Sequence, residues 1–309
     1  MDPITHALTG LALSVAEKPF TTVAPGATWW ASFLGSQVPD ADIVARFRGS
    51  LPYLKHHRGF THSVPGVLLG GMAVAAVVRA FFPGEPFIAL FAFSVLSEAI
   101  HVFLDLLTSY GTRVAWPWSR RRYAYDLLMI VDPVLMILLG LVPLTASLTD
   151  RPVLASVLGF GLVSVYLLAR LISRQRAERF LRQAVPGKLG NLAVLPGLLG
   201  LRTWKFVRDE GDQFVTGCVD TFIGKIAVEA EVPKNSDGLP QLAYNSPSVE
   251  VFLDFARFPA ATEQRAGDRT VITWEDVRYR YGRHGRFLAH VIIGSNGELI
   301  GEGLGPAQP

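Results

Sequence analysis

The sequence predicts a mainly α-helical membrane bundle followed by a small soluble α+β domain that is rich in β-strands. Only 18% of the 309 residues are charged and 50% are hydrophobic, with a mean hydropathy of +0.32, whereas soluble domains carry about 25% charged residues. Apolar runs near the bilayer-crossing length of about 20 residues lie within residues 1–200. After residue 204 the apolar residues alternate as they do in strands. We therefore predict a membrane-embedded helical domain over 1–200 and a β-rich domain over 201–309.

Charge is divided unevenly between these two parts. Residues 1–200 contain 17 Lys and Arg against 11 Asp and Glu, and residues 201–309 contain 12 against 15. Anionic lipid accounts for the basic membrane part, so no nucleic-acid partner is expected. The single cysteine, Cys218, excludes an internal disulfide and a cysteine-cluster metal site. The N-terminus lacks a basic n-region, so we do not expect a cleaved signal peptide.

Two short apolar segments open the chain. Residues 5–16 form a helix that carries His6 near its start, and a second segment over about 23–38 ends at Pro39-Asp40-Ala41-Asp42. Both are short for full membrane spans. They fit a tilted or re-entrant helical hairpin that neighbouring helices shield from lipid.

Four longer apolar segments follow and set the predicted topology. Loops 43–63 and 110–126 contain four Lys or Arg each, and the segment after residue 172 contains five. The positive-inside rule makes these segments cytoplasmic. The predicted multi-pass protein therefore has both its N- and C-termini in the cytoplasm. The four spans are Val64–Phe82, Phe87–Leu107, Leu127–Leu148 and Pro152–Ile172.

The β-rich part is predicted from alternation and turn signals. Asn296-Gly297 is a turn signal, and no catalytic constellation is visible after residue 204. The predicted hairpin, helix and later strands cover Phe214–Phe222, Ile223–Val232, Ser248–Arg257, Thr270–Tyr281 and Phe287–Gly294.

The predicted topology brings most of the polar residues of the membrane part to one depth. His57 and His62 are five residues apart, with Gly59 between them to let the backbone turn. Imidazoles held that close, beside carboxylates, suit a borderline transition metal. In the alternative interpretation, 56–63 is a basic juxtamembrane loop whose histidines have no role. The residues that converge are His6, Asp40, Asp42, His56, His57, His62, His101, Asp105 and Asp126.

Three polar residues interrupt the span over Phe87–Leu107. Glu98, His101 and Asp105 occupy positions i, i+3 and i+7, so they share one helix face. Each ionisable group costs roughly 2.5–3.5 kcal/mol within a membrane helix and usually faces a partner or a wet cavity. A structural polar seam would explain one such residue. Three of them opposite loop histidines favour a metal or catalytic site, and the i, i+4 spacing of His101 and Asp105 suits two ligands of one ion.

Other polar residues allow more than one role. Arg58 can hold a phosphate or pair with Asp40 or Asp42, and a lipid-facing role is equally compatible with the sequence. His56 ranks last among the loop histidines because its position in the pattern is the most exposed. Asp132 precedes Pro133, where its side chain can accept backbone donors at a helix break or can lie behind the metal ligands and contact them.

At several of these residues the chain resembles the YdjM-type membrane-bound metal-dependent hydrolases, also described as LexA-regulated inner-membrane-associated hydrolases. The resemblance covers about residues 1–145 and leaves Glu98 and the tail after 204 outside. It implies an α-helical membrane hydrolase whose His and Asp positions bind metal, with a remote likeness to zinc phospholipase C. The matching motifs are MDPITHA at 1–7, VPDAD at 38–42, HRGFTHS at 57–63, HVFLD at 101–105, TSYGT at 108–112, WPWS at 116–119 and Asp132-Pro133.

Together these observations favour a metal-dependent hydrolase in the inner membrane of a bacterium, with its site facing the cytoplasm. The ligands would be His57 or His62, His101, Asp105 and one of Asp40, Asp42 or His6. Glu98 or Asp40 would act as the general base, and Arg58 would assist at a phosphate. Zinc is the expected divalent metal, with manganese or iron as alternatives. A site at headgroup depth predicts a phospholipid or lipid-linked phosphoester substrate, while an acyl ester or amide stays open.

The alternative is a non-enzymatic membrane protein, either a metal-stabilised scaffold or an ion-handling protein whose soluble tail binds a protein partner. A closed shell of protein ligands would favour the scaffold over the enzyme. A transporter should show paired interrupted helices in two related halves. The sequence shows a single polar, interrupted helix without that symmetry.

Overall fold

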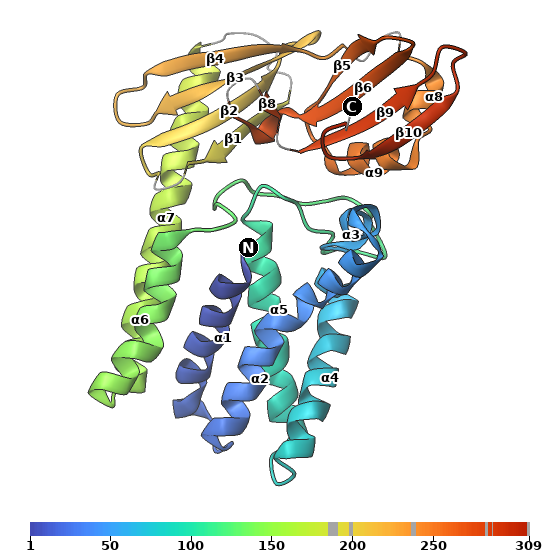
Figure 1. The fold of residues 1–309 in the computed structure, drawn as a ribbon. Coiled ribbons are helices and arrows are strands. Elements are labelled where there is room, and N and C mark those ends of the chain that lie inside the picture. The colour runs from blue at the N-terminus through green and yellow to red at the C-terminus, as the bar shows by residue number, and fades with distance from the viewer. Residues whose placement is uncertain (185–190, 198–199, 236–238, 282–283, 286, 308–309) are drawn as a thin grey trace. The chain divides into compact units, whose positions relative to one another are not determined.

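The computed structural model describes residues 1–184, 191–197, 200–235, 239–281, 284–285 and 287–307 (Figure 1). The chain divides into two compact units. The first contains Met1–Phe47 and His56–Ile172, and the second contains Arg48–Lys55 and Ser173–Pro309. The first is helical, and the second is built on β-sheets. The predicted fold class, a helical membrane part followed by a β-rich domain, is confirmed.

The first unit opens with a helical hairpin. Helix α1, Pro3–Glu17, begins at Asp2, whose carboxylate accepts hydrogen bonds from the backbone N–H groups of the first turn, with Pro3 at the first helical position. The short 3₁₀ turn η1, Lys18–Phe20, reverses the chain into α2, Pro25–Gln37. Helix α2 continues as the 3₁₀ segment η2, Val38–Arg48.

Three helices of the described residues are long and apolar enough to cross a membrane. They are α4, Val64–Phe81, α5, Phe87–Leu106, and α7, Pro152–Ala184. The shorter apolar helix α6, Pro133–Thr149, lies between α5 and α7 in the chain. Their surfaces expose many large apolar side chains, such as Leu69 and Val157, as helices facing lipid do.

Two segments differ from the sequence prediction. Helix α6 begins at Pro133 rather than at Leu127, because the Asp132 carboxylate caps its first turn and the residues before it are extended against the end of α5. Segment 43–63, predicted as a loop, contains the rest of η2, the helix α3, Ser50–His56, and the 3₁₀ turn η3, Phe60–His62. Helical periodicity is difficult to detect in elements this short.

Small residues allow α2 to approach α5 closely. A Cβ on Gly35 would lie 2.7 Å from the backbone oxygen of Ser94, so the two backbones meet there without an intervening side chain. The nearby core contains Ala27, Ala31 and Ala75 together with larger residues of α4 and α5. This contact brings the end of α2 beside the polar face of α5.

Within its described residues, the second unit contains two four-stranded antiparallel sheets and a two-stranded one (Figure 1). The first sheet has the order β1-β2-β3-β4, formed by Leu192–Pro196, Thr203–Asp209, Gln213–Asp220 and Ile226–Pro233. The second has the order β10-β9-β6-β5, formed by Leu299–Leu304, Leu288–Ile293, Arg269–Asp276 and Pro259–Ala266. The small sheet pairs β7, Arg280–Tyr281, with β8, His284–Gly285.

Two short helices, α8, Gln241–Tyr244, and α9, Pro247–Phe255, belong to the second sheet's half of this unit. Phe252 of α9 packs with Trp274 and Val291 in an apolar core. A second core joins Val207 and Phe214 of the first sheet to Phe258. The hairpin predicted over Phe214–Val232 and the helix predicted over Ser248–Arg257 are confirmed within a few residues.

Candidate metal centre

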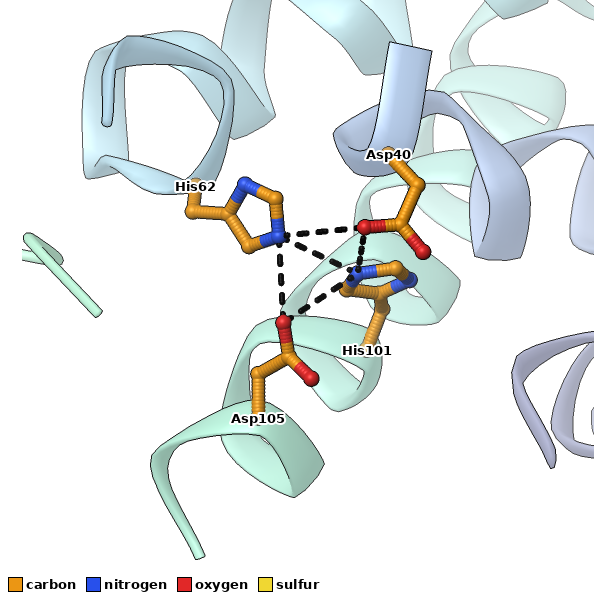
Figure 2. A group of neighbouring side chains, drawn as sticks. All are labelled: Asp40, His62, His101 and Asp105. Carbon is orange, nitrogen blue, oxygen red and sulfur yellow. Dashed lines mark hydrogen bonds and ion pairs between the residues drawn. The ribbon is translucent and has the colours of Figure 1, made fainter. Parts of the chain in front are cut away.

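Three segments of the first unit bring two histidines and two aspartates together. Asp40 comes from η2, His62 from η3, and His101 and Asp105 from consecutive turns of α5. One ligand atom of each of these four residues lies within 4.8 Å of the corresponding atoms of the others. Figure 2 shows their side chains pointing toward one another. We call these four residues the primary group.

The donor atoms of the primary group stand at ligand-like separations. His62 Nε2 lies 3.3 Å from His101 Nε2 and 3.1 Å from Asp105 Oδ2. His101 Nε2 lies 3.7 Å from Asp105 Oδ2, and Asp40 Oδ1 lies 3.7 Å from both Nε2 atoms (Figure 2). At ligand distances of about 2.0–2.2 Å, donors around a tetrahedral ion stand about 3.3–3.6 Å apart. The group therefore fits a single cation.

The tautomer of His101 is determined by its backbone partner. His101 Nδ1 lies 2.7 Å from the backbone carbonyl oxygen of Ser36. Because a carbonyl can only accept, Nδ1 carries the hydrogen, and the Nε2 lone pair of the neutral ring is directed into the primary group. A hydrogen bond from the other ring nitrogen orients metal-binding histidines in the same way.

His62 is oriented in the same sense by a chain of hydroxyl and carboxylate groups. Its Nδ1 lies 3.1 Å from Thr61 Oγ1, which donates to Asp42 Oδ2 at 3.3 Å. Nδ1 therefore donates, and Nε2 presents its lone pair. Burial, the largest cause, lowers the pKa of His62 well below its ordinary value and so favours the neutral ring. The two Nε2 lone pairs thus face each other, an arrangement that a cation stabilises.

The two oxygens of Asp105 have different surroundings. Oδ1 lies 2.9 Å from the Arg58 guanidinium and also contacts the Met1 amino group. Oδ2 is buried and makes no hydrogen bond to any residue that the structure describes. A buried carboxylate oxygen without a donor is costly unless a cation faces it, and Oδ2 is the oxygen that points toward His62 and His101.

Arg58 holds Asp105 rather than Asp40 or Asp42. Its side chain is 3% exposed, and it also donates to Thr108 Oγ1 at 2.9 Å. The backbone of Arg58 has a positive φ of 55°, and its N–H donates to Asp42 Oδ2 at 2.8 Å. The side chain is therefore directed into the protein, so it does not face lipid.

His6 and Glu98 lie beside the primary group but outside it. The His6 ring stacks on His101 with 3.5 Å between centroids, and its Nε2 lies 3.4 Å from Asp105 Oδ1. The Glu98 carboxylate lies against α4, where a Cβ on Gly70 would stand 2.4 Å from Oε2. Both side chains are fully buried.

A second set of possible ligands adjoins the first. Suitable atoms of Asp40, Asp42 and His57 also lie within 4.8 Å of one another. His57 Nδ1 is 2.9 Å from Asp42 Oδ1. Asp40 therefore belongs to both sets, and we call Asp40, Asp42 and His57 the secondary group. Burial raises the pKa of the Asp40 carboxyl, and the nearby Met1 amino group, His57 and Arg58 oppose that rise.

The remaining candidates take other positions. His56 is exposed and belongs to neither group. Asp132 caps α6 and accepts hydrogen bonds from the Tyr166 hydroxyl at 2.9 Å, one of the roles expected from the sequence. Sequence reasoning missed Ser36 and Thr61, which orient the two histidines. Thr61 lies inside the HRGFTHS motif, whereas nothing in the sequence marks the carbonyl of Ser36.

The apolar helices and the buried group of His and Asp side chains place this chain in the class of helical membrane proteins with a candidate metal centre. The YdjM inner membrane protein family matches residues 1–177, and the chain belongs to this family. The resemblance inferred from the motifs is thereby confirmed. The family name and the three long apolar helices also fit the predicted insertion in a membrane.

Two further similarities include the second unit. The YfhP C-terminal alpha/beta plait domain matches residues 239–307. Over 302 residues the chain is 27% identical to the uncharacterized protein YfhP of Bacillus subtilis (strain 168), covering 95% of this chain and 91% of that protein. No solved structure matches.

Proposed function

We propose that this protein is a metal-dependent hydrolase of the bacterial inner membrane that acts on a phospholipid or a lipid-linked phosphoester. The observation that carries the proposal is the convergence of two imidazole lone pairs and a carboxylate oxygen without a hydrogen-bond donor. Mixed His and Asp donors at these separations suit Zn²⁺, with Mn²⁺ or Fe²⁺ as alternatives.

His62, His101 and Asp105 would supply three ligands, the number common in catalytic zinc sites. When bound, a divalent cation polarises the scissile group and lowers the pKa of water toward 7. The side chains of His62, His101 and Asp105 are 0% exposed, whereas that of Asp40 is 22% exposed. Water and substrate would therefore approach from the side of Asp40, which is placed either to complete the ligand set or to accept a proton.

Two residues expected to be catalytic receive narrower roles in this proposal. Arg58 would act as a positioning residue, because its buried guanidinium lies 2.9 Å from Asp105 Oδ1 and orients that carboxylate. Glu98 lies outside the primary group, so Asp40 is the better placed of the two candidate bases. A base must come within hydrogen-bonding reach of the proton that it takes.

The position of the group along the chain supports a lipid substrate. His101 and Asp105 occupy the last two turns of the apolar helix α5, and His62 directly precedes α4. The group therefore lies where both helices leave the apolar region, at the depth of lipid headgroups. The adjoining basic segments would place this end in the cytoplasm. The expected partner of the helical unit is membrane lipid. The second unit would bind a protein partner, and we expect no nucleic-acid partner.

Metal analysis followed by a substrate panel tests this function. Full-length protein in detergent should contain tightly bound divalent metal by elemental analysis. It should release product from phospholipids or lipid phosphates, and a His101→Ala variant should do neither. His56→Gln is the matched control, because His56 lies in the same segment but in neither group. If the protein holds metal but hydrolyses no phosphoester, acyl ester or amide of an amphiphile, the scaffold or ion-handling alternative replaces the enzyme.

Reporter fusions test the proposed orientation. We expect multi-pass insertion with both termini in the cytoplasm, since segments 43–63, 110–126 and 173–188 carry most of the Lys and Arg of the membrane part. A fusion after residue 309 should be active with a cytoplasmic reporter and inactive with a periplasmic one. The reverse result would move the site to the periplasmic side.

A further inference from the structure

Asp40 belongs to two groups of possible metal ligands at once. Its Oδ1 atom lies 3.7 Å from His62 Nε2 and 3.7 Å from His101 Nε2. Figure 2 shows these two approaches as dashed lines from one Asp40 oxygen. The atoms of Asp42 and His57 that could bind metal lie within 4.8 Å of Asp40. One carboxylate thus lies close to both sets of possible ligands.

We infer that the site holds two divalent cations, one in each group, with the carboxylate of Asp40 bridging them. This inference rests on the proposed metal site at the primary group and adds a second ion to it. Of the two roles proposed above for Asp40, it selects that of ligand rather than that of base. Paired ions in hydrolytic sites stand about 3.5–4 Å apart, a separation that a bridging carboxylate spans.

Compared with the primary group, the secondary group has a larger share of carboxylate ligands, which suit harder cations, and its side chains are more exposed to water. It offers two carboxylates and one imidazole, whereas the primary group offers two imidazoles and two carboxylates. His57 Nδ1 and Asp42 Oδ1 are 2.9 Å apart, about the separation of adjacent donors around an octahedral ion with ligands at 2.0–2.1 Å. The side chains of His57 and Asp40 are 13% and 22% exposed. Water can therefore complete the coordination of the second ion.

A purely structural role for Asp42 is the competing explanation. Its Oδ2 accepts hydrogen bonds from the Arg58 N–H at 2.8 Å and from Thr61 at 3.3 Å, and these bonds hold the turn that carries His62. Both bonds use Oδ2, so Oδ1 remains directed to His57. In the structural explanation, His57 only forms a hydrogen bond with Asp42. In the two-ion explanation, His57 and Asp42 are both ligands of the second cation.

Metal stoichiometry distinguishes the two explanations. Full-length protein in detergent is loaded with Mn²⁺, desalted, and analysed for manganese per chain and by electron paramagnetic resonance. We expect two ions per chain with the spectrum of an exchange-coupled pair. His57→Gln should retain one ion with an uncoupled spectrum, and His56→Gln should retain two coupled ions. His57→Gln removes a proposed ligand while leaving the Asp42 contacts to Arg58 and Thr61 in place.

The outcomes separate this inference from the proposed function. One ion per chain in the unaltered protein, or two coupled ions in His57→Gln, would overturn the second site. If the one-ion protein still hydrolyses a lipid phosphoester, the proposed function survives without the second ion. If two coupled ions are found without hydrolysis, the second site stands and the hydrolase does not. Should His57→Gln fold poorly, Asp40→Asn offers a second test, since loss of the bridge should abolish coupling.

Discussion

The two units bury charged groups in contrasting ways. In the second unit, Asp276 and Arg278 are fully buried, and their side chains form a fork with distances of 2.6–3.1 Å. The backbone N–H groups of Arg257 and Arg278 also donate to this carboxylate, at 3.2 and 3.1 Å. In the first unit, Asp105 Oδ2 is equally buried but lies 3.1 and 3.7 Å from two imidazole nitrogens, and it makes no hydrogen bond within the part of the chain that the structure describes.

This difference separates charged groups whose partners lie within the protein from charged groups that a bound cation would stabilise. A buried carboxylate with a guanidinium and two backbone donors is complete, and it needs nothing from outside the chain. A buried carboxylate oxygen that meets only acceptors raises the free energy of the folded protein until a cation occupies the space. The first arrangement is therefore typical of a structural role, and the second is typical of a candidate cation site.

The largest expected effect is complete loss of bound metal when a residue of the primary group is replaced. His101→Ala and Asp105→Ala should each abolish stoichiometric metal binding, measured by elemental analysis of purified protein. The two variants should differ in folding. Asp105→Ala also leaves the buried Arg58 guanidinium without its carboxylate, a defect that costs about 3–5 kcal/mol, whereas His101→Ala leaves no buried charge unpaired. If both variants keep full metal occupancy, the group has been misassigned.

Replacing a residue of the buried Asp276–Arg278 pair should lower the stability of the second unit without changing metal binding. Arg278→Ala leaves the Asp276 carboxylate buried without its partner, so we expect the second unit to lose about 3–5 kcal/mol of stability. Pulse proteolysis across a urea series measures this change, and the metal content should remain that of the unaltered protein. Lys234→Gln, which removes a partly exposed pair with Asp209, should cost no more than about 1 kcal/mol. Equal losses in the two variants would contradict the structural role assigned to the buried pair.

A smaller effect should follow from separating α5, which carries His101 and Asp105, from α2, which continues into the η2 segment of Asp40. In Gly35→Ala the new Cβ would stand 2.7 Å from the backbone oxygen of Ser94, so α2 and α5 must move apart. Overpacking of this kind costs about 1–3 kcal/mol, and the shift of His101 away from Ser36 and Asp40 should weaken metal binding in a chelator competition. Gly161→Ala in α7 meets no atom within 4 Å and should leave metal affinity unchanged.

The smallest effect should come from removing a solvent-exposed ion pair, which is neither a buried structural pair nor part of the primary group. Arg182 and Glu178 stand 2.7 Å apart on the surface of α7, with side chains 54% and 29% exposed. Solvent screens such a pair, so Arg182→Gln should change stability by only about 0.3–0.5 kcal/mol and leave metal binding intact. A loss of several kcal/mol in the urea series would show that burial is not what distinguishes the two units.

Much of the architecture follows from local composition. Long apolar runs predict α4 and α5 to within about a residue at each end, because burial of apolar surface in lipid needs only length and hydropathy. Alternation predicts the β3–β4 hairpin for a similar reason. Strand β1, Leu192–Pro196, was not predicted, since its short apolar stretch becomes a strand only by pairing with β2.

The sequence also determines which residue types are available to the site, and on α5 it determines their common face. It does not determine which loop histidine joins them. His57 and His62 are equivalent by composition, and only the turn at Gly59 and the contacts of Asp42 place His62 in the primary group and His57 in the secondary one. Likewise, the lone pair of His101 is directed by the carbonyl of Ser36, a partner 65 residues away in the chain. Helix and strand preferences act between near neighbours, whereas donor geometry depends on contacts between distant segments, which only the packed tertiary structure decides.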